Sequence, residues 1–202
     1  ELLQEKLSDK KQRDFLDIII NEGSRLGRMI NNVLTFSKGE QGELTKKSEE
    51  TNISVLITEV IDKFNLQFTK NEMEILYEET KLPIIQTDRD MIEQILINLV
   101  GNAVKYGSTG KYLAIKTEIK KDFIVIYIED HGPGIVESER SKIFKPFYRI
   151  DNSLSQNHSG TGIGLSIART LAKETGSILV LERSNTGAVF SLSIPINMEP
   201  ET

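Results

Sequence analysis

Four short motifs in a fixed order along residues 98–165 constrain this chain more than any other feature of its sequence. They are an asparagine pair followed by Lys-Tyr, a loop that begins Asp-His-Gly, a Phe-Lys-Pro-Phe segment and a run of alternating glycines. In full they are Asn98, Asn102, Lys105 and Tyr106, then Asp130-His131-Gly132-Pro133-Gly134-Ile135, then Phe144-Lys145-Pro146-Phe147, and last Gly160-Thr161-Gly162-Ile163-Gly164-Leu165. Each motif alone is weak evidence, and only their combination restricts the fold that the chain can adopt.

The composition is that of a folded protein in a reducing compartment. The 202 residues are 38% hydrophobic and 27% charged, which supports one packed domain of about 150 residues plus a smaller element and excludes disorder. The net charge of −5 argues against a nucleic-acid partner, because nucleic-acid-binding domains usually carry a basic face. Cysteine is absent, which excludes disulfides and thiolate metal sites and predicts a cytoplasmic location.

We expect no membrane-spanning segment within the chain. No apolar run approaches ~18 residues, and the N-terminal residues do not resemble a signal peptide. The chain does not begin with Met. We therefore expect a cytoplasmic fragment, and any membrane anchor of the full-length protein would lie in segments outside it.

The pattern of residues 10–38 predicts one long amphipathic helix. Its apolar stripe consists of Phe15, Ile18, Ile19, Leu26, Met29, Ile30, Val33 and Leu34. A stripe of this length has to be covered by a hairpin partner, by a second subunit, or by both. The alternative is a helix that packs on its own globular domain. Leu2, Leu3 and Leu7 indicate the tail of a preceding helix.

A polar linker at 39–52 precedes a predicted second domain at 53–197, and a short tail follows at 198–202. The predicted elements are a helix from Ser54 to about Phe68, a strand at 72–78, a helix from Thr87 or Asp88 to Tyr106, strands at 112–120 and 123–130, a helix from Gly164 to Thr175, and a hairpin of 178–183 with 188–195. This order indicates an α/β sandwich with helices on one face of a mixed, mainly antiparallel sheet. The long aperiodic stretch at 131–161 predicts a functional loop or lid.

The helix at 88–106 carries the asparagine pair on a polar face. Its polar residues Asn98, Asn102, Lys105 and Tyr106 fall within a sector of about 100°. An amide oxygen is a good ligand for Mg²⁺ beside phosphate oxygens, and a lysine one turn on can meet a phosphate as a point charge. The alternative is an ordinary polar helix face.

Asp130 and the later glycines have functional interpretations of the same kind. Asp130 ends an apolar strand and precedes glycines, so it could accept a hydrogen bond from the amine of a buried heterocycle. Gly160, Gly162 and Gly164 precede a helix whose N–H groups and positive dipole end favour phosphate. A plain turn at Asp130 and a flexible hinge at the glycines are the alternatives. Together the motifs predict a pocket for a nucleoside triphosphate with its metal.

The motifs resemble the N, G1, F and G2 boxes of sensor histidine kinases, which share the Bergerat ATP-binding fold with gyrase and Hsp90. The resemblance covers essentially the whole chain. Residues 54–196 look like the catalytic ATP-binding domain, and residues 1–38 look like the second helix of the dimerisation and histidine-phosphotransfer hairpin. The segment Phe-Tyr-Arg-Ile-Asp at 147–151 strengthens the match.

The resemblance implies ATP and Mg²⁺ as cofactors and a role for each matching residue. Asp130 would bind the adenine amino group. The residues implied around the nucleotide are Tyr106, Gly132, Gly134, Ile135 and Phe147. Asn98 and Asn102 would hold Mg²⁺ on the phosphates, and Lys105 and Arg149 would meet phosphate charge, so that Asn98, Asn102 and Lys105 form the catalytic set. The lid residues implied around the phosphates are Gly160, Thr161, Gly162, Ile163, Gly164 and Leu165.

The chain departs from the family pattern in two places. The last glycine box is only partly present, since Asn185-Thr186-Gly187-Ala188-Val189 lacks its usual first glycine and following Thr. This removes the basis for expecting adenine-edge contacts from that box. The phosphoacceptor His would lie on the first hairpin helix, of which only Leu2–Leu7 is present. The histidines of the chain, His131 and His158, fall in the adenine box and the lid, where they are interpreted as loop residues.

The implied function is transfer of the γ-phosphoryl of ATP to an upstream His, for relay to an Asp of a response-regulator receiver domain. The implied partners are that receiver domain, the chain's own phosphotransfer helix and, at full length, a second copy. An ATP hydrolase or ATP-gated clamp and a non-enzymatic nucleotide-binding scaffold are the alternatives. Hydrolysis needs a base to activate water, but Asn98 stands where hydrolases place a Glu, and Glu93 lies roughly 140° around the helix. Residues Asn152–Ser159 are expected to gain order with the γ-phosphate.

Overall fold

The computed structural model describes residues 10–78, 80–150 and 161–196. In chain order the helices and strands are α1 (Lys10–Gln41), β1 (Glu49–Asn52), α2 (Ile53–Lys70), β2 (Glu74–Tyr77), β3 (Ile84–Thr87), α3 (Arg89–Tyr106), β4 (Tyr112–Lys120), β5 (Phe123–Asp130), α4 (Gly164–Glu174), β6 (Ile178–Leu181) and β7 (Val189–Pro195), with short 3-10 turns at Ser108–Gly110 and Glu137–Glu139. None of the helices in the described ranges is both long and apolar enough to cross a membrane.

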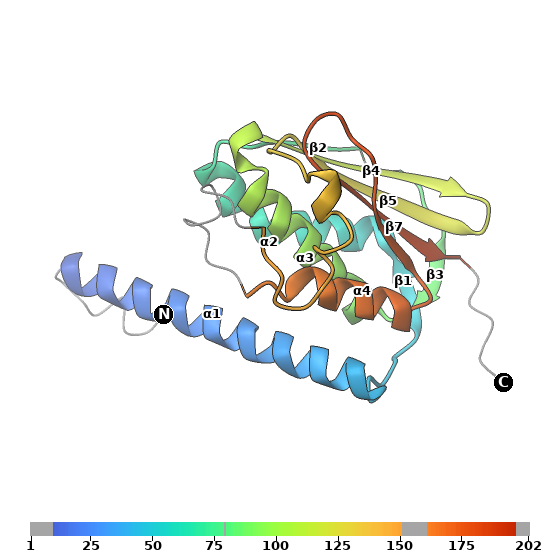
Figure 1. Cartoon of the computed structure of the whole chain (residues 1–202), viewed down its shortest axis with the longest axis horizontal. Coiled ribbons are helices and arrows are strands. Elements are labelled where there is room, and N and C mark those ends of the chain that lie inside the picture. The colour runs from blue at the N-terminus through green and yellow to red at the C-terminus, as the bar shows by residue number, and fades with distance from the viewer. Residues whose placement is uncertain (1–9, 79, 151–160, 197–202) are drawn as a thin grey trace.

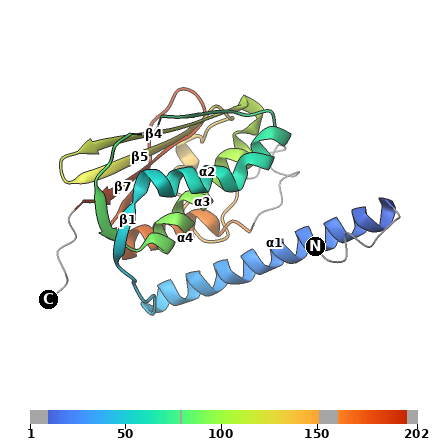
Figure 2. The ribbon, with the colours of Figure 1, turned by 180° about the vertical axis from the view of Figure 1, so that it is seen from behind.

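The main sheet has five strands in the order β2-β4-β5-β7-β6. Only the β2–β4 pair is parallel, and the pairs β4–β5, β5–β7 and β6–β7 are antiparallel. Helices α2, α3 and α4 cover one face of this sheet (Figures 1 and 2). The predicted α/β sandwich with a mixed, mainly antiparallel sheet is therefore confirmed.

Alternation along β5 explains which face of the sheet is covered. Ile124, Ile126 and Ile128 are at most 1% exposed, and they share one core with Ile95 and Leu99 of α3. Because successive strand residues point to opposite faces, these isoleucines all face the helices. Each large side chain buried in this way contributes about 1.5–3 kcal/mol, and the helix that carries the asparagine pair is thereby fixed on the sheet.

A small second sheet was not predicted from the sequence. Strands β1 and β3 pair antiparallel, with Glu49 opposite Thr87. The linker expected over residues 39–52 is therefore wrong for its last four residues, because the polar segment Glu-Glu-Thr-Asn has no apolar alternation to mark it as a strand. The N-cap of α2 is Asn52 instead of Ser54, and its side chain accepts hydrogen bonds from the N–H groups of Ser54 and Val55.

Helix α1 contacts the rest of the molecule through its C-terminal part, which lies beside α4 (Figures 1 and 2). At Gly39 a Cβ atom would lie 2.5 Å from Cγ2 of Thr170 on α4, so the two helices approach closely there. The side chains of the predicted apolar stripe are between 41% and 67% exposed. Among the described residues the stripe is therefore uncovered, which is compatible with the hairpin and second-subunit hypotheses. The expected preceding helix at Leu2, Leu3 and Leu7 lies outside the described residues.

Asp88 ties the segment after α1 to the start of α3. It is 3% exposed, its Oδ1 accepts from the Met91 N–H at 2.9 Å and its Oδ2 accepts from the Lys47 N–H at 2.7 Å. One carboxylate thus caps α3, which confirms Asp88 over Thr87 as the cap, and also holds the chain that leads in from α1.

Asp88→Asn should lower the free energy of unfolding by about 1–2 kcal/mol, because an amide would turn a donor toward one of the two N–H groups. Asp90→Asn is the matched control, since Asp90 is an exposed acid in the first turn of the same helix and its charge is worth at most about 1 kcal/mol. Urea denaturation measures both variants. Equally small effects would show that Asp88 does not hold the two segments together.

Candidate nucleotide-binding site

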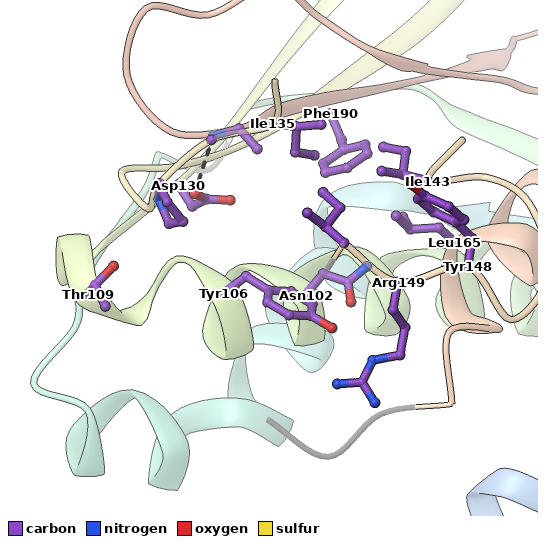
Figure 3. Close-up of a pocket in the computed structure, with 14 residues that line it drawn as sticks. Asn102, Tyr106, Thr109, Asp130, Ile135, Ile143, Tyr148, Arg149, Leu165 and Phe190 are labelled. Atoms are coloured by element: carbon purple, nitrogen blue, oxygen red, sulfur yellow. Dashed lines mark hydrogen bonds between the residues drawn. The ribbon is translucent and has the colours of Figure 1, made fainter. Parts of the chain in front are cut away.

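A cavity of ≈ 180 Å³ lies between α3, the loop after β5 and the start of α4. Its lining residues are Asn102, Tyr106, Thr109, Asp130, Pro133, Gly134, Ile135, Ile143, Tyr148, Arg149, Ile150, Leu165, Ala188 and Phe190. Figure 3 shows Asn102 and Tyr106 on the α3 side and Ile135 and Phe190 on the opposite side. An apolar cavity with a few polar groups is the usual form of a small-molecule site.

Asp130 is the one acid among the described residues that line this cavity. It is 7% exposed, and its Oδ1 accepts from the N–H groups of Gly132 at 2.9 Å and Ala188 at 3.3 Å. Burial raises the pKa of the carboxyl, and the two backbone hydrogen bonds oppose this by stabilising its charge. The other oxygen accepts no hydrogen bond from the described residues and points into the cavity (Figure 3).

Glycines from three separate segments allow this placement of Asp130. A Cβ at Gly107 would lie 2.5 Å from Cβ of Asp130, and a Cβ at Gly132 would lie 2.6 Å from the Tyr106 carbonyl oxygen. A Cβ at Gly187 would overlap the Asp130 carbonyl, and Gly187 also has a φ of +63°. The incomplete last glycine box therefore does contact Asp130, through Gly187 and Ala188, which the sequence analysis did not expect.

The polar face of α3 is divided between the cavity and its border. Asn102 and Tyr106 line the cavity. Lys105 lies beside Tyr106, with its Nζ 2.9 Å from the Tyr106 hydroxyl. Asn98 donates from Nδ2 to the Gln94 carbonyl at 2.9 Å, while its Oδ1 faces Gly164, where a Cβ would lie 2.9 Å from that oxygen. The Asn98 amide oxygen is thus near the start of α4.

This arrangement is chemically compatible with a magnesium–phosphate group. The described residues contain no group of three or more His, Asp or Glu that could hold a metal. A metal at this site would depend on amide oxygens and on phosphate oxygens of a ligand, and hard cations such as Mg²⁺ accept that donor set.

The glycine motif leads into α4 at the edge of the cavity. Gly162 has a φ of +72°, and a Cβ on it would lie 2.9 Å from the carbonyl carbon of Phe147. The Thr161 Oγ1 accepts from the Ile163 N–H at 3.4 Å, Ile163 is fully buried, and Leu165 lines the cavity. The first N–H groups of α4 have no partner within the helix. Gly160 and the expected lid at Asn152–Ser159 lie outside the described residues.

The Phe-Lys-Pro-Phe segment is fixed by its first aromatic ring. Phe144 meets Phe190 edge to face at 6.4 Å, and the Arg169 guanidinium of α4 lies 5.1 Å from the centre of its ring. Phe147 has a φ of +62° and is 65% exposed. The neighbouring Tyr148 lines the cavity and donates a hydrogen bond to Glu139.

The cavity includes some of the predicted site residues and not others. Those that line it are Asn102, Tyr106, Asp130, Gly134, Ile135, Arg149 and Leu165. Those placed beside it are Asn98, Lys105, Gly132, Phe147, Thr161, Gly162, Ile163 and Gly164. The lining residues that were not predicted from the sequence are Thr109, Pro133, Ile143, Tyr148, Ile150, Ala188 and Phe190. Alternation in the last strand marks Phe190 as a core residue, but nothing local marks it as part of a site.

Glu93 is directed away from the cavity. It makes ion pairs with Lys63 of α2 and, at 3.4 Å, with Arg89 one turn earlier in α3. Its carboxylate is therefore held between α2 and α3. A base acting on a ligand in the cavity would have to lie on another side of α3.

The chain matches two protein-family models. One is "Histidine kinase-, DNA gyrase B-, and HSP90-like ATPase" over residues 87–198, more than half of the chain. The other is "His Kinase A (phospho-acceptor) domain" over residues 1–42. The chain is also 30% identical over 213 residues to the hybrid signal transduction protein dokA of Dictyostelium discoideum, which covers 98% of this chain but only 13% of that protein.

Solved structures agree with the family models. A full-length ShkA in complex with AMPPNP has a TM-score of 0.80 at 23% identity, over 99% of this chain and 42% of that one, and supports the fold alone. The histidine kinase ThkA in complex with the response regulator protein TrrA has a TM-score of 0.69 at 26% identity, over 97% and 55%. The chain thus spans only part of the longer proteins that it matches. It belongs to the family of histidine kinase-, DNA gyrase B- and HSP90-like ATPases, and its second match likens it to the catalytic and dimerisation region of histidine kinases.

Proposed function

We propose that this chain binds ATP with Mg²⁺ and transfers the γ-phosphoryl group to a histidine that is neither of its own two. The observation that carries the proposal is the Asp130 carboxylate at the end of an apolar cavity, with one oxygen held by backbone N–H groups and the other directed inward. An ionised acceptor in that position selects a ligand that presents a donor, as the exocyclic amine of adenine does.

The lining residues would divide the nucleotide between them. Ile135, Ile143, Leu165 and Phe190 offer an apolar surface to a flat base. Arg149 and Lys105 supply positive charge on the side of Asn102, and α4 presents its N-terminus next to Leu165. The phosphates would therefore lie along the start of α4, and the base would lie near Asp130.

Asn102 and Asn98 would hold Mg²⁺ on the phosphates through their amide oxygens. The ion would neutralise charge on the phosphates during transfer. Asn98 already directs its Oδ1 toward Gly164 because its Nδ2 is bound to Gln94. Helix α3 would thus supply both amides from one rigid element, which fixes their separation.

Transfer is favoured over hydrolysis by what surrounds the phosphate end. Hydrolysis needs a base to activate water, whereas Asn98 is an amide and Glu93 is held by Lys63 and Arg89. An ATP hydrolase and a nucleotide-binding scaffold remain the competing functions, and the experiments below separate them from a kinase.

The proposed partners follow from helix α1 and from the relatives. The exposed stripe of α1 suits a phosphotransfer helix and a second copy of the chain. The complex of ThkA with TrrA supports a response-regulator receiver domain as the phosphoryl recipient. We place this region in the cytoplasm, and any membrane attachment of the full-length protein would be through other segments.

Asp130→Asn should weaken ADP binding by about 2 kcal/mol or more, because a charged acceptor for the base is lost. It should not lower the free energy of unfolding at neutral pH. A raised pKa means that ionised Asp130 costs stability above that pKa, and a neutral amide removes this cost.

Isothermal titration measures the effect of Asp130→Asn on ADP affinity, and urea denaturation measures its effect on the free energy of unfolding. The matched control is Asp122→Asn in the exposed β4–β5 turn, and unchanged affinity in the Asp130 variant would remove Asp130 from the base site.

Asn102→Ala should reduce phosphoryl transfer and Mg²⁺-ATP binding at least about tenfold, and should affect Mg²⁺-free ADP much less, because Asn102 is proposed to act on metal and phosphate. Titrations with and without Mg²⁺ give the comparison. Asn65→Ala on the exposed face of α2 is the control. An equal loss of Mg²⁺-free ADP binding would mean that Asn102 acts on the base or on the fold.

The chain incubated with ATP and Mg²⁺ should acquire no acid-labile, alkali-stable phosphate. His131 is stacked on the ring of Tyr112, and His158, which lies outside the described residues, is predicted from the sequence to be a loop residue. A helix that carries a family phosphoacceptor His, added in trans, should be labelled if it can pair with α1. Strong labelling of the chain itself that is lost in His158→Gln or His131→Gln would contradict the proposal.

A further inference from the structure

The segment after the Asp130 loop forms one side of the cavity without being a regular helix or strand. The lining residues that it supplies are Ile143, Tyr148, Arg149 and Ile150. Its backbone is joined by isolated turn hydrogen bonds, such as the one from the Tyr148 N–H to the Lys145 carbonyl at 3.2 Å. Contacts of side chains therefore contribute more to the shape of this wall than they would in a helix or a strand.

Glu139 joins the beginning of this segment to its end. The Tyr148 hydroxyl donates a hydrogen bond to Oε2 of Glu139, which lies nine residues earlier, and Nζ of Lys142 donates to Oε1 at 3.1 Å. The Glu139 carbonyl also accepts from the Ile143 N–H at 3.0 Å. The side chain of Glu139 is only 15% exposed, so both carboxylate oxygens are bound by protein donors in a largely buried position.

Arg140, the next residue, anchors the same turn to the main sheet. Its Nη2 donates to the Leu181 carbonyl oxygen at 2.5 Å, at the end of the edge strand β6. Ile143 is 7% exposed and belongs to the core. Glu139 is thus held on a fixed base, and through its carboxylate the Tyr148 ring is placed relative to the sheet.

Tyr148 lies at the opposite end of the cavity from Asp130, beside Leu165 at the start of α4 (Figure 3). A Cβ at Gly162 would lie 2.9 Å from the Tyr148 carbonyl oxygen, so the backbone of Tyr148 packs against the glycine motif. Arg149 follows directly and lines the cavity. A displacement of Tyr148 would therefore also move the residues that are proposed to meet the phosphates.

We propose that Glu139 is a positioning residue for the nucleotide site: its carboxylate holds the Tyr148 hydroxyl, so that the ring stays in place as a wall of the cavity and Arg149 stays on the phosphate side. This inference rests on the proposed function, in which the cavity binds ATP. The wall is ordered before the nucleotide arrives, so less side-chain freedom is lost on binding.

An ionised carboxylate is well suited to this role. A hydrogen bond to an ionised acceptor is about twice as strong as one between neutral groups. The hydrogen bond from Tyr148, followed by the one from Lys142, lowers the pKa of Glu139 and so stabilises its charged form. A glutamate at 139 can therefore hold the Tyr148 ring more firmly than a neutral acceptor would.

The test is a double-mutant cycle on the affinity for the non-hydrolysable ATP analogue AMPPNP with Mg²⁺, measured by isothermal titration. Glu139→Ala removes the acceptor, and Tyr148→Phe removes the donor but keeps the ring. Each should weaken binding about fivefold, the effect of having to order roughly one side chain on binding. Because both changes break the same contact, the double variant should bind about as tightly as the weaker single variant. Glu139→Gln keeps a neutral acceptor and should recover part of the loss.

The matched controls remove neighbouring charges and leave the Tyr148 contact intact. Lys142→Ala removes the other partner of the same carboxylate, and Glu137→Ala removes an acid on the same turn whose side chain is 79% exposed. Both should bind AMPPNP within about twofold of wild type. Urea denaturation checks that each variant is folded, and Tyr148→Phe with Glu139→Gln keeps the test if Glu139→Ala does not fold, since both preserve side-chain size.

Failure of this inference can be told apart from failure of the function on which it rests. Wild type that does not bind AMPPNP would overturn the proposed function and the role of Glu139 with it. If wild type binds, unchanged affinity in the Glu139 variants, or single losses that multiply in the double variant, would overturn the role of Glu139 alone.

Discussion

The site depends on one buried carboxylate, because Asp130 can face the cavity only if its first oxygen is satisfied by backbone. The two N–H donors belong to Gly132, two residues on, and to Ala188, 58 residues away and directly before the last strand. Their meeting requires β5 and β7 to pair in register and glycines to stand at 107, 132 and 187. The position of Asp130 is therefore set by strand pairing and by glycines that leave room for it, more than by a polar network of its own.

This arrangement places a stability cost where the function requires it. The inward oxygen of Asp130 is removed from bulk water, and burial raises the pKa of the group. A ligand donor would replace the water that was lost, so part of the cost of the folded protein would be recovered on binding. Asp88 shows the contrast: both of its carboxylate oxygens accept backbone hydrogen bonds, so it stabilises the fold but has no capacity left for a ligand.

Local patterns predicted most of the fold, and long-range contacts account for most of what was missed. Helix α3 and strands β4 and β5 were predicted almost to the residue, because their apolar periodicity is strong and their turns are short. Strand β1 was missed because its pairing with β3 leaves no periodic signal in Glu49–Asn52. The cavity shows the same division: Asp130 and Asn102 were identified from motifs, whereas Phe190 and Gly187 reach the site through strand pairing that no local pattern encodes.

The distribution of carboxylates among the described residues favours the proposed transfer over hydrolysis. Asp130 is the one acid among the described lining residues, and in the proposed function it binds the base, away from the phosphates. Glu93 is on the right helix but is held by Lys63 and Arg89, so releasing it would break two ion pairs and turn it around α3. Among the residues that the structure describes, water at the phosphate end would thus have no carboxylate base to activate it. An imidazole acceptor is itself a nucleophile at neutral pH, and it needs from this site only a positioned, charge-neutralised phosphoryl group.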